Sequence, residues 1–174
     1  TTHRNTPFLP NITLPKDITA THDLSALHAG KEALLLVAPS AFLRAICEQL
    51  KSTALSSEIP LIVCTKGIEQ ETTLFMSEVV EEIFPKNSVL ALSGPTFADE
   101  IAANMPATAA IACDNKGVAK RYATVLSTPH FQLTPSNDTI GVQIGGAIKN
   151  IIAIACGIAA GKNWGKNAQA ALIT

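Results

Sequence analysis

The stretch Ala33-Leu34-Leu35-Leu36-Val37-Ala38-Pro39-Ser40 indicates the fold of this protein. Its apolar residues run without interruption and then stop at a proline and a serine. A strand that covers only one face of a core alternates polar and apolar residues, whereas an unbroken apolar run is typical of a strand buried on both faces of a parallel sheet. We therefore expect residues 33–38 to form such a strand.

The chain beyond this stretch alternates between helical and extended patterns. Each helical pattern is followed by a short apolar run that ends at glycine, proline or a polar residue. Helices that connect short buried strands are typical of a mostly parallel α/β sheet. The expected helices are 23–28, 41–51 (with Phe42, Ile46, Cys47 and Leu50 on one side), 74–84, 96–103 and 117–126, and the expected strands are 33–38, 61–64, 88–92, 107–113 and 131–133.

From Thr139 the helical pattern continues for more than twenty residues, and no strand follows. We place a domain boundary near Asn137. Residues 1–137 would form the α/β domain, and residues 138–174 would form the start of an all-α domain.

The composition excludes several kinds of partner. The chain is 47% hydrophobic with a net charge of −1, and its 13 lysines and arginines are spread along its 174 residues. This pattern argues against nucleic acid and against a charged membrane surface, since both select clustered positive charge. The four cysteines lie far apart in apolar stretches, which indicates reduced core thiols in a cytoplasmic protein, with no metal site.

The most apolar segment, residues 139–161, is interrupted by Gln143, Lys149 and Asn150. A membrane-spanning helix is expected to carry few such groups, so we expect no integral membrane segment. The first ten residues also lack the apolar run of a secretory leader.

Polar residues follow three of the expected strands, as Pro39-Ser40, Thr65-Lys66-Gly67 and Ser93-Gly94-Pro95-Thr96. Ligands of open parallel sheets bind beyond the carboxyl ends of the strands, so these turns would open onto one ligand site. The last turn leads into a helix whose N-terminus could hold a phosphate. Three other interpretations stay open: Pro39-Ser40 as an ordinary strand stop, Lys66 as a solvated cap, and Thr96 as a helix N-cap.

Small residues flank Lys149 on the long helix. At helical spacing Gly141, Gly145, Lys149, Ala153 and Gly157 fall in one row. The row would let a ligand or another backbone approach the amine closely, and apolar burial together with a second cation would make the amine a readier proton donor. We therefore predict a catalytic lysine. The alternative is that the glycines serve helix packing and Lys149 extends to the surface. A second side of this helix is expected to pack into a core through Ile140, Ile144, Ile151, Ile154 and Ile158.

Three segments together resemble one known family. They are Thr65-Lys66-Gly67-Ile68-Glu69, Ser93-Gly94-Pro95-Thr96-Phe97-Ala98 and Gly145-Gly146-Ala147-Ile148-Lys149-Asn150-Ile151-Ile152-Ala153. In this order they are similar to the bacterial NAD(P)-dependent glycerol-3-phosphate dehydrogenases. Phe8-Leu9-Pro10, Val37-Ala38-Pro39-Ser40 and residues 167–174 extend the resemblance over nearly the whole chain.

The resemblance implies a cytoplasmic oxidoreductase that interconverts dihydroxyacetone phosphate and sn-glycerol 3-phosphate with NAD or NADP and supplies phospholipid synthesis. It implies a partial Rossmann-like dinucleotide-binding domain over residues 1–137 and the start of a helical substrate domain over residues 138–174, and it leaves room for a homodimer. By position, it makes Lys149 the general acid/base and a substrate contact, Lys66 a contact of substrate and cofactor, Gly94 and Thr96 substrate contacts, and Ala98 and Pro39 cofactor contacts.

The sequence departs from the family pattern in two places. The family begins with a strand and a GxGxxG turn for the pyrophosphate, and the sequence contains no such turn. The resemblance also places further substrate-binding residues, an aspartate and an Arg-Asn pair, beyond Thr174. We therefore expect both ends to be missing, and the chain as given to bind a dinucleotide poorly and to have little activity.

Two other functions stay open. One is a related two-domain reductase of the 2-ketopantoate or 6-phosphogluconate type. The other is a non-catalytic folding or dimerisation unit. The preference between NAD and NADP is not predicted, because the residues that meet the ribose 2′ position normally follow the first strand of the fold.

Overall fold

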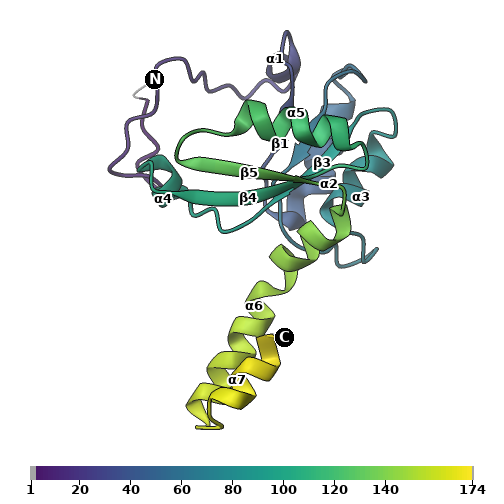
Figure 1. Ribbon diagram of the computed structural model, residues 1–174. Helices are drawn as coiled ribbons and strands as arrows, with labels where there is room; N and C mark the ends of the chain where they lie inside the picture. The colour runs from purple at the N-terminus through teal and green to yellow at the C-terminus, as the bar shows by residue number, and fades with distance from the viewer. Residues whose placement is uncertain (1–2, 174) are drawn as a thin grey trace.

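The computed structural model describes residues 3–173 and confirms the expected α/β fold. Five strands form one sheet in chain order, with helices on both faces and a long helical arm at the C-terminal end (Figure 1). The strands are β1 (Leu34–Leu36), β2 (Leu61–Val63), β3 (Val89–Ser93), β4 (Ala107–Ala112) and β5 (Phe131–Ser136).

The sheet is mostly parallel, as predicted. The pairs β1–β2, β2–β3 and β4–β5 are parallel, and β3–β4 is antiparallel. Strand β5 is longer than predicted and runs through Pro135, which lies opposite Ile111. Proline is tolerated there because, among the described strands, β5 is at the edge of the sheet, with no further neighbour to which it could donate a hydrogen bond.

Helices cover both faces of the sheet and produce two apolar cores. Helices α2 (Ser40–Lys51) and α3 (Met76–Ile83) pack on the face that carries Leu61 and Val63. Helix α5 (Lys116–Leu126) packs on the opposite face with Ile62. Successive residues of a strand point to opposite faces, so β2 is buried on both sides, as its unbroken apolar sequence predicts. The same prediction is wrong for β1, which is shorter than residues 33–38 and is covered on the α2 side only. Leu35, on its other face, is 51% exposed, because β1 lies at the end of the sheet, away from α5.

Two details of the helices differ from the prediction. In α2 the buried residues are Leu43, Cys47 and Leu50, whereas Phe42 is 60% exposed. The two short helices, α1 (Ser25–His28) and α4 (Ala98–Ala102), are shorter than the predicted helices 23–28 and 96–103, and neither buries a residue. The predicted apolar side of α2 is thus confirmed at Cys47 and Leu50 and wrong at Phe42, whose place in the core is taken by Leu43.

Helix α6 (Thr139–Gly161) extends away from the sheet, and α7 (Lys166–Ile173) folds back along it (Figure 1). The prediction that one side of α6 packs into a core is wrong for this chain. The isoleucines of that side are all at least 41% exposed: Ile140, Ile144, Ile151, Ile154 and Ile158. The reason is geometric, since α6 leaves the sheet and, of the described helices, mainly α7 lies along its far half.

By length and composition alone, α6 could cross a membrane, and it is the one helix of residues 3–173 that could. Little of its apolar segment is buried. Its first turns are nevertheless tied to the sheet domain by the buried side chain of Gln143.

Candidate functional site

The turns after β1, β2 and β3 lie at one edge of the sheet, because these three strands are parallel to one another. The first two turns are packed together. The hydroxyl of Thr65 donates to the carbonyl of Ala38 at 2.7 Å. Gly67 has a φ of +132°, and a Cβ there would lie 3.4 Å from Ser40. Glycine is needed here for its backbone conformation, and it lets the two turns touch.

Lys66 joins the second turn to the third. Its Nζ donates to the carbonyl of Gly94 at 2.6 Å. Its stem lies along Gly146 of α6, where a Cβ would be 3.5 Å from the Lys66 side chain. Burial of the amine lowers the pKa of Lys66, and the positive charge of Lys149 lowers it further. Residues from β2, β3 and α6 therefore meet at this lysine.

Helix α6 reaches this edge through one glycine. A Cβ on Gly146 would lie 2.5 Å from the Oγ of Ser93, so no larger residue fits without movement. No other part of the described chain makes the predicted close approach at Gly145 or Gly157, because a Cβ there would meet only open space, and the approach of a ligand along this row stays a prediction. The contact is made one residue further round the helix.

Lys149 lies at the same edge but is exposed. Its Nζ sits 5.6 Å from the centroid of the Phe97 ring, a distance at which the ring face attracts a cation. The predicted burial of Lys149 is therefore wrong. The predicted pairing with Lys66 is present, and it is the Lys66 amine that is desolvated.

The other candidate residues surround the two lysines. Thr96 is half-buried, and its hydroxyl lies 3.5 Å from the carbonyl of Gly94. Pro39 and Ala98 are exposed, each at the start of a helix. Thr96 is not the N-cap of α4, because the helix begins at Ala98 and Phe97 precedes it. The N-cap position of α4 is therefore Phe97, one residue after the predicted Thr96.

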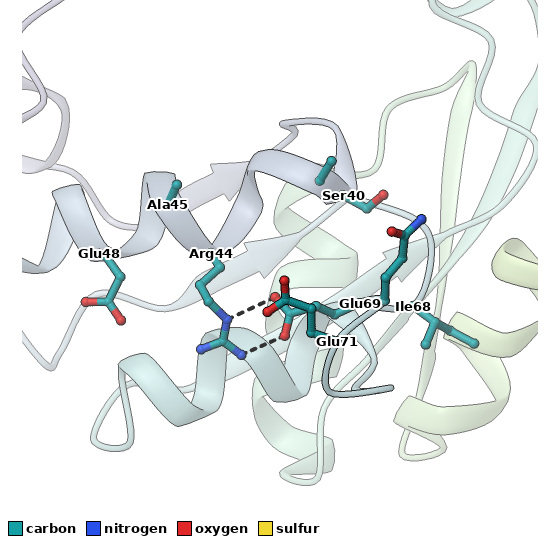
Figure 2. Close-up of a pocket in the computed structure, with 9 residues that line it drawn as sticks. Ser40, Arg44, Ala45, Glu48, Ile68, Glu69 and Glu71 are labelled. Carbon is teal, nitrogen blue, oxygen red and sulfur yellow. Dashed lines mark hydrogen bonds and ion pairs between the residues drawn. The ribbon is translucent and has the colours of Figure 1, made fainter.

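An open pocket of about 560 Å³ lies between α2 and the loop that follows Gly67. Figure 2 shows Arg44 and Glu69 facing each other across it. The Arg44 guanidinium donates to both carboxylate oxygens of Glu69 at 2.9 and 2.8 Å, and to Glu82 at 2.9 Å. This two-pronged ion pair ties the loop after Lys66 to α2 and α3.

Because of this ion pair, the free energy of unfolding should depend on pH in the acidic range. Hydrogen bonds from Arg44 and Thr72 lower the pKa of Glu69 from 4.5 to about 2. Because folding lowers this pKa, the stabilisation is complete above about pH 4.5 and disappears as the pH falls towards 2. In urea titrations at a series of pH values, the wild-type midpoint should fall across this window more steeply than that of Glu69→Gln.

Glu71→Gln is the matched control for the acid titration. Glu71 lines the same pocket and makes no ion pair in the described part of the chain. Its pH dependence should therefore follow that of the wild type. Equal slopes for wild type and Glu69→Gln would show that the ion pair contributes nothing.

The exposed side chains at this edge fit part of a dinucleotide. Val37, Phe42 and Phe97 are between 60% and 69% exposed. The Phe97 ring lies beside Lys149, and an apolar surface next to a lysine suits a planar ring with a neighbouring anionic group. The donors for a pyrophosphate, which a GxGxxG turn would supply, are not part of this sequence. The residues present therefore fit one portion of the cofactor.

Comparisons with known proteins agree with this arrangement. Residues 1–119 match the family described as NAD-dependent glycerol-3-phosphate dehydrogenase N-terminus, and residues 138–174 match its C-terminus counterpart. Glycerol-3-phosphate dehydrogenase [NAD(P)+] of Parvibaculum lavamentivorans is 42% identical over 100% of this chain and 52% of its own length.

Among solved structures, the chain is similar to further glycerol-3-phosphate dehydrogenases. Glycerol-3-phosphate dehydrogenase from Coxiella burnetii has a TM-score of 0.86 at 33% identity, over 99% of this chain and 52% of its own. The Plasmodium falciparum enzyme has a TM-score of 0.89 at 29% identity, over 97% of this chain and 48% of its own. The chain spans about half the length of the relatives it matches.

Proposed function

This chain belongs to the NAD-dependent glycerol-3-phosphate dehydrogenase family, and from that premise we propose that the protein interconverts sn-glycerol 3-phosphate and dihydroxyacetone phosphate with NAD or NADP. One observation carries the proposal. Two lysines from separate elements, Lys66 after β2 and Lys149 on α6, come together at the carboxyl edge of the sheet. Two such cations suit a reaction that moves a proton and binds a phosphate.

Each candidate residue has a proposed role. Lys149 is the general acid/base, and Lys66 contacts both substrate and cofactor. The remaining contacts are Gly94 and Thr96 for the substrate, and Ala98 and Pro39 for the cofactor. The placement of all six residues around one sheet edge supports this assignment.

In the direction of reduction, a bound reduced nicotinamide, held by Lys66, Ala98 and Pro39, would supply the hydride that the carbonyl carbon of dihydroxyacetone phosphate receives. The Lys149 ammonium gives its proton to the carbonyl oxygen, and in the reverse direction the neutral amine takes the proton back. The Phe97 ring holds that ammonium over the site. Lys66, anchored on the Gly94 carbonyl, stabilises negative charge on the bound substrate.

The biological setting is also part of the proposal. Residues 1–137 form the dinucleotide-binding domain and residues 138–174 the start of the substrate domain, which the start of the second family match at residue 138 supports. The product would supply phospholipid synthesis in the cytoplasm. The partner would be a small phosphorylated molecule, and a homodimer is compatible with this assignment.

A substrate panel tests the proposed reaction. The natural protein, with its intact mass measured, is assayed by loss of reduced nicotinamide with dihydroxyacetone phosphate and with 2-ketopantoate, and by its gain with 6-phosphogluconate. We expect kcat/KM for dihydroxyacetone phosphate to exceed the others by at least about 10³-fold, because a phosphate and a small ketone must both be matched. Preference for another substrate, or no turnover with any, would overturn the proposal.

A further inference from the structure

The N-terminus of α3 is capped by a side chain from another helix. Amide groups in the first turn of a helix have no partner within the helix, and the residue before α3, Phe75, offers no side-chain acceptor. The amide of Ser77 instead donates to the Oε1 of Gln143 on α6 at 2.9 Å. The Nε2 of Gln143 donates to the Ser77 hydroxyl at 2.9 Å and to the carbonyl of Thr139 at 3.1 Å.

The two hydrogen bonds between Gln143 and Ser77 are buried, and the one to Thr139 is part-buried. Ser77 is 3% exposed and Gln143 is 9% exposed. A buried polar group that loses its partner carries a desolvation penalty, so the two side chains hold each other in one arrangement. The pair therefore sets where α6 begins relative to α3.

Gln143 also lies where it can control the helix that bears Lys149. Of the described α6 residues only Gln143 and Ala159 are buried, and Ala159 lies in the far half of the helix. Gln143, Gly146 and Lys149 are each three residues apart, so each neighbours the next on the helix surface. Gly146 lies against Ser93, where a Cβ would be 2.5 Å from the Ser93 Oγ, so this close contact depends on how α6 is rotated about its axis.

We propose that Gln143 is the positioning residue of Lys149: its bonds to Ser77 set the rotation and depth of α6 at the sheet edge, and so place the Lys149 ammonium beside Lys66 and Phe97. The inference rests on the proposed function, and it adds a residue that touches neither substrate nor cofactor.

The test is Gln143→Met, which keeps the length of the side chain and removes all three hydrogen bonds. The pKa of Lys66, followed by NMR of ¹³C-methylated lysines in this chain, should rise towards its ordinary value. The reason is that movement of α6 would expose the Lys66 side chain where Gly146 now covers it, and would carry the positive charge of Lys149 away from the Lys66 amine. A thioether in place of an amide would by itself shift this pKa downwards, so a rise reports movement of the helix.

Turnover gives an independent readout. In the natural protein Gln143→Met should lower kcat on the order of 10- to 100-fold with little change in KM, because a misplaced proton donor affects the chemical step. Gln143→Glu, whose carboxylate can still accept from the Ser77 amide, should recover most of the kcat. Gln143→Asn, one methylene shorter, serves as a second test if the methionine variant does not fold, and should raise the Lys66 pKa in the same direction.

Val79→Ala is the matched control for lost stability. Val79 is fully buried on α3, in a core cluster that contains no residue of α6. This variant should lower Tm and leave both the Lys66 pKa and kcat unchanged. An unchanged Lys66 pKa in folded Gln143→Met or Gln143→Asn would overturn the inference, and so would an equal shift in Val79→Ala.

Failure of the proposed function gives a different result. If Lys149 were not the proton donor, Lys149→Met would keep a normal kcat while Gln143→Met still raised the Lys66 pKa. That combination would retain Gln143 as the residue that positions α6 and would remove the role of Lys149.

Discussion

Replacing Lys149 by alanine is expected to lower kcat by roughly 10²- to 10⁴-fold, the usual contribution of a positioned general acid or base. The KM for dihydroxyacetone phosphate should change little, because the proton transfer matters in the transition state and less in the bound ground state. Steady-state rates of the natural protein with NADH and with NADPH measure both constants.

Two further lysine variants test whether this loss is specific. Lys162→Ala removes an exposed lysine at the end of the same helix and should leave kcat unchanged. Lys66→Met should raise KM more than Lys149→Ala does, since Lys66 is proposed to contact substrate and cofactor directly. A near-normal kcat in Lys149→Ala would contradict the proposal that Lys149 is the general acid/base.

Replacing Gly94 by alanine should lower the free energy of unfolding by roughly 3 kcal/mol or more, at or beyond the upper end of the usual cost of overpacking. A Cβ there would lie 2.7 Å from both Cα and Cβ of Ala109, and 2.9 Å from the Thr108 carbonyl oxygen. These atoms belong mainly to the backbone of β4, which is hydrogen-bonded on both sides and cannot rotate out of the way. Urea unfolding of the purified chain measures the change.

Gly145→Ala is the control for the Gly94 substitution. A Cβ at Gly145 meets nothing within 4 Å, and alanine favours the helix by up to about 1 kcal/mol. This variant should therefore be as stable as the wild type or more so. Equal losses in Gly94→Ala and Gly145→Ala would contradict the close approach of β3 and β4.

The central part of the fold could be predicted from the sequence because its signals are local. The apolar run at β1 and the strand ends at Lys66 and Gly94 depend on neighbouring residues and on the general rule for parallel sheets. The predicted sheet and the shared edge of the three turns are confirmed for this reason.

The details of the site depend on contacts between distant residues. Helical spacing places Gly145 and Gly146 side by side, and only the packing of α6 on Ser93 shows which of them makes the contact. Similarly, Gln143 interrupts an apolar segment, which indicates a buried polar group with a partner. Nothing in the sequence identifies that partner as Ser77, 66 residues earlier. Lys149 is exposed because α6 extends away from the sheet. The helical period of the sequence predicts the helix but not the direction in which it runs.

The order of the strands in the sheet has a consequence for how the chain acquires its structure. Every strand pairs with the strand that immediately precedes it along the chain, from β1 to β5. Each parallel pairing closes over a connection that contains one helix, α2, α3 or α5, and the entropy cost of closing such a connection grows only slowly with its length. Within the described residues, each strand from β2 to β5 can therefore pair as soon as it follows its partner out of the ribosome, and α6, which needs both Ser77 and Ser93 in place, docks after β3 has formed.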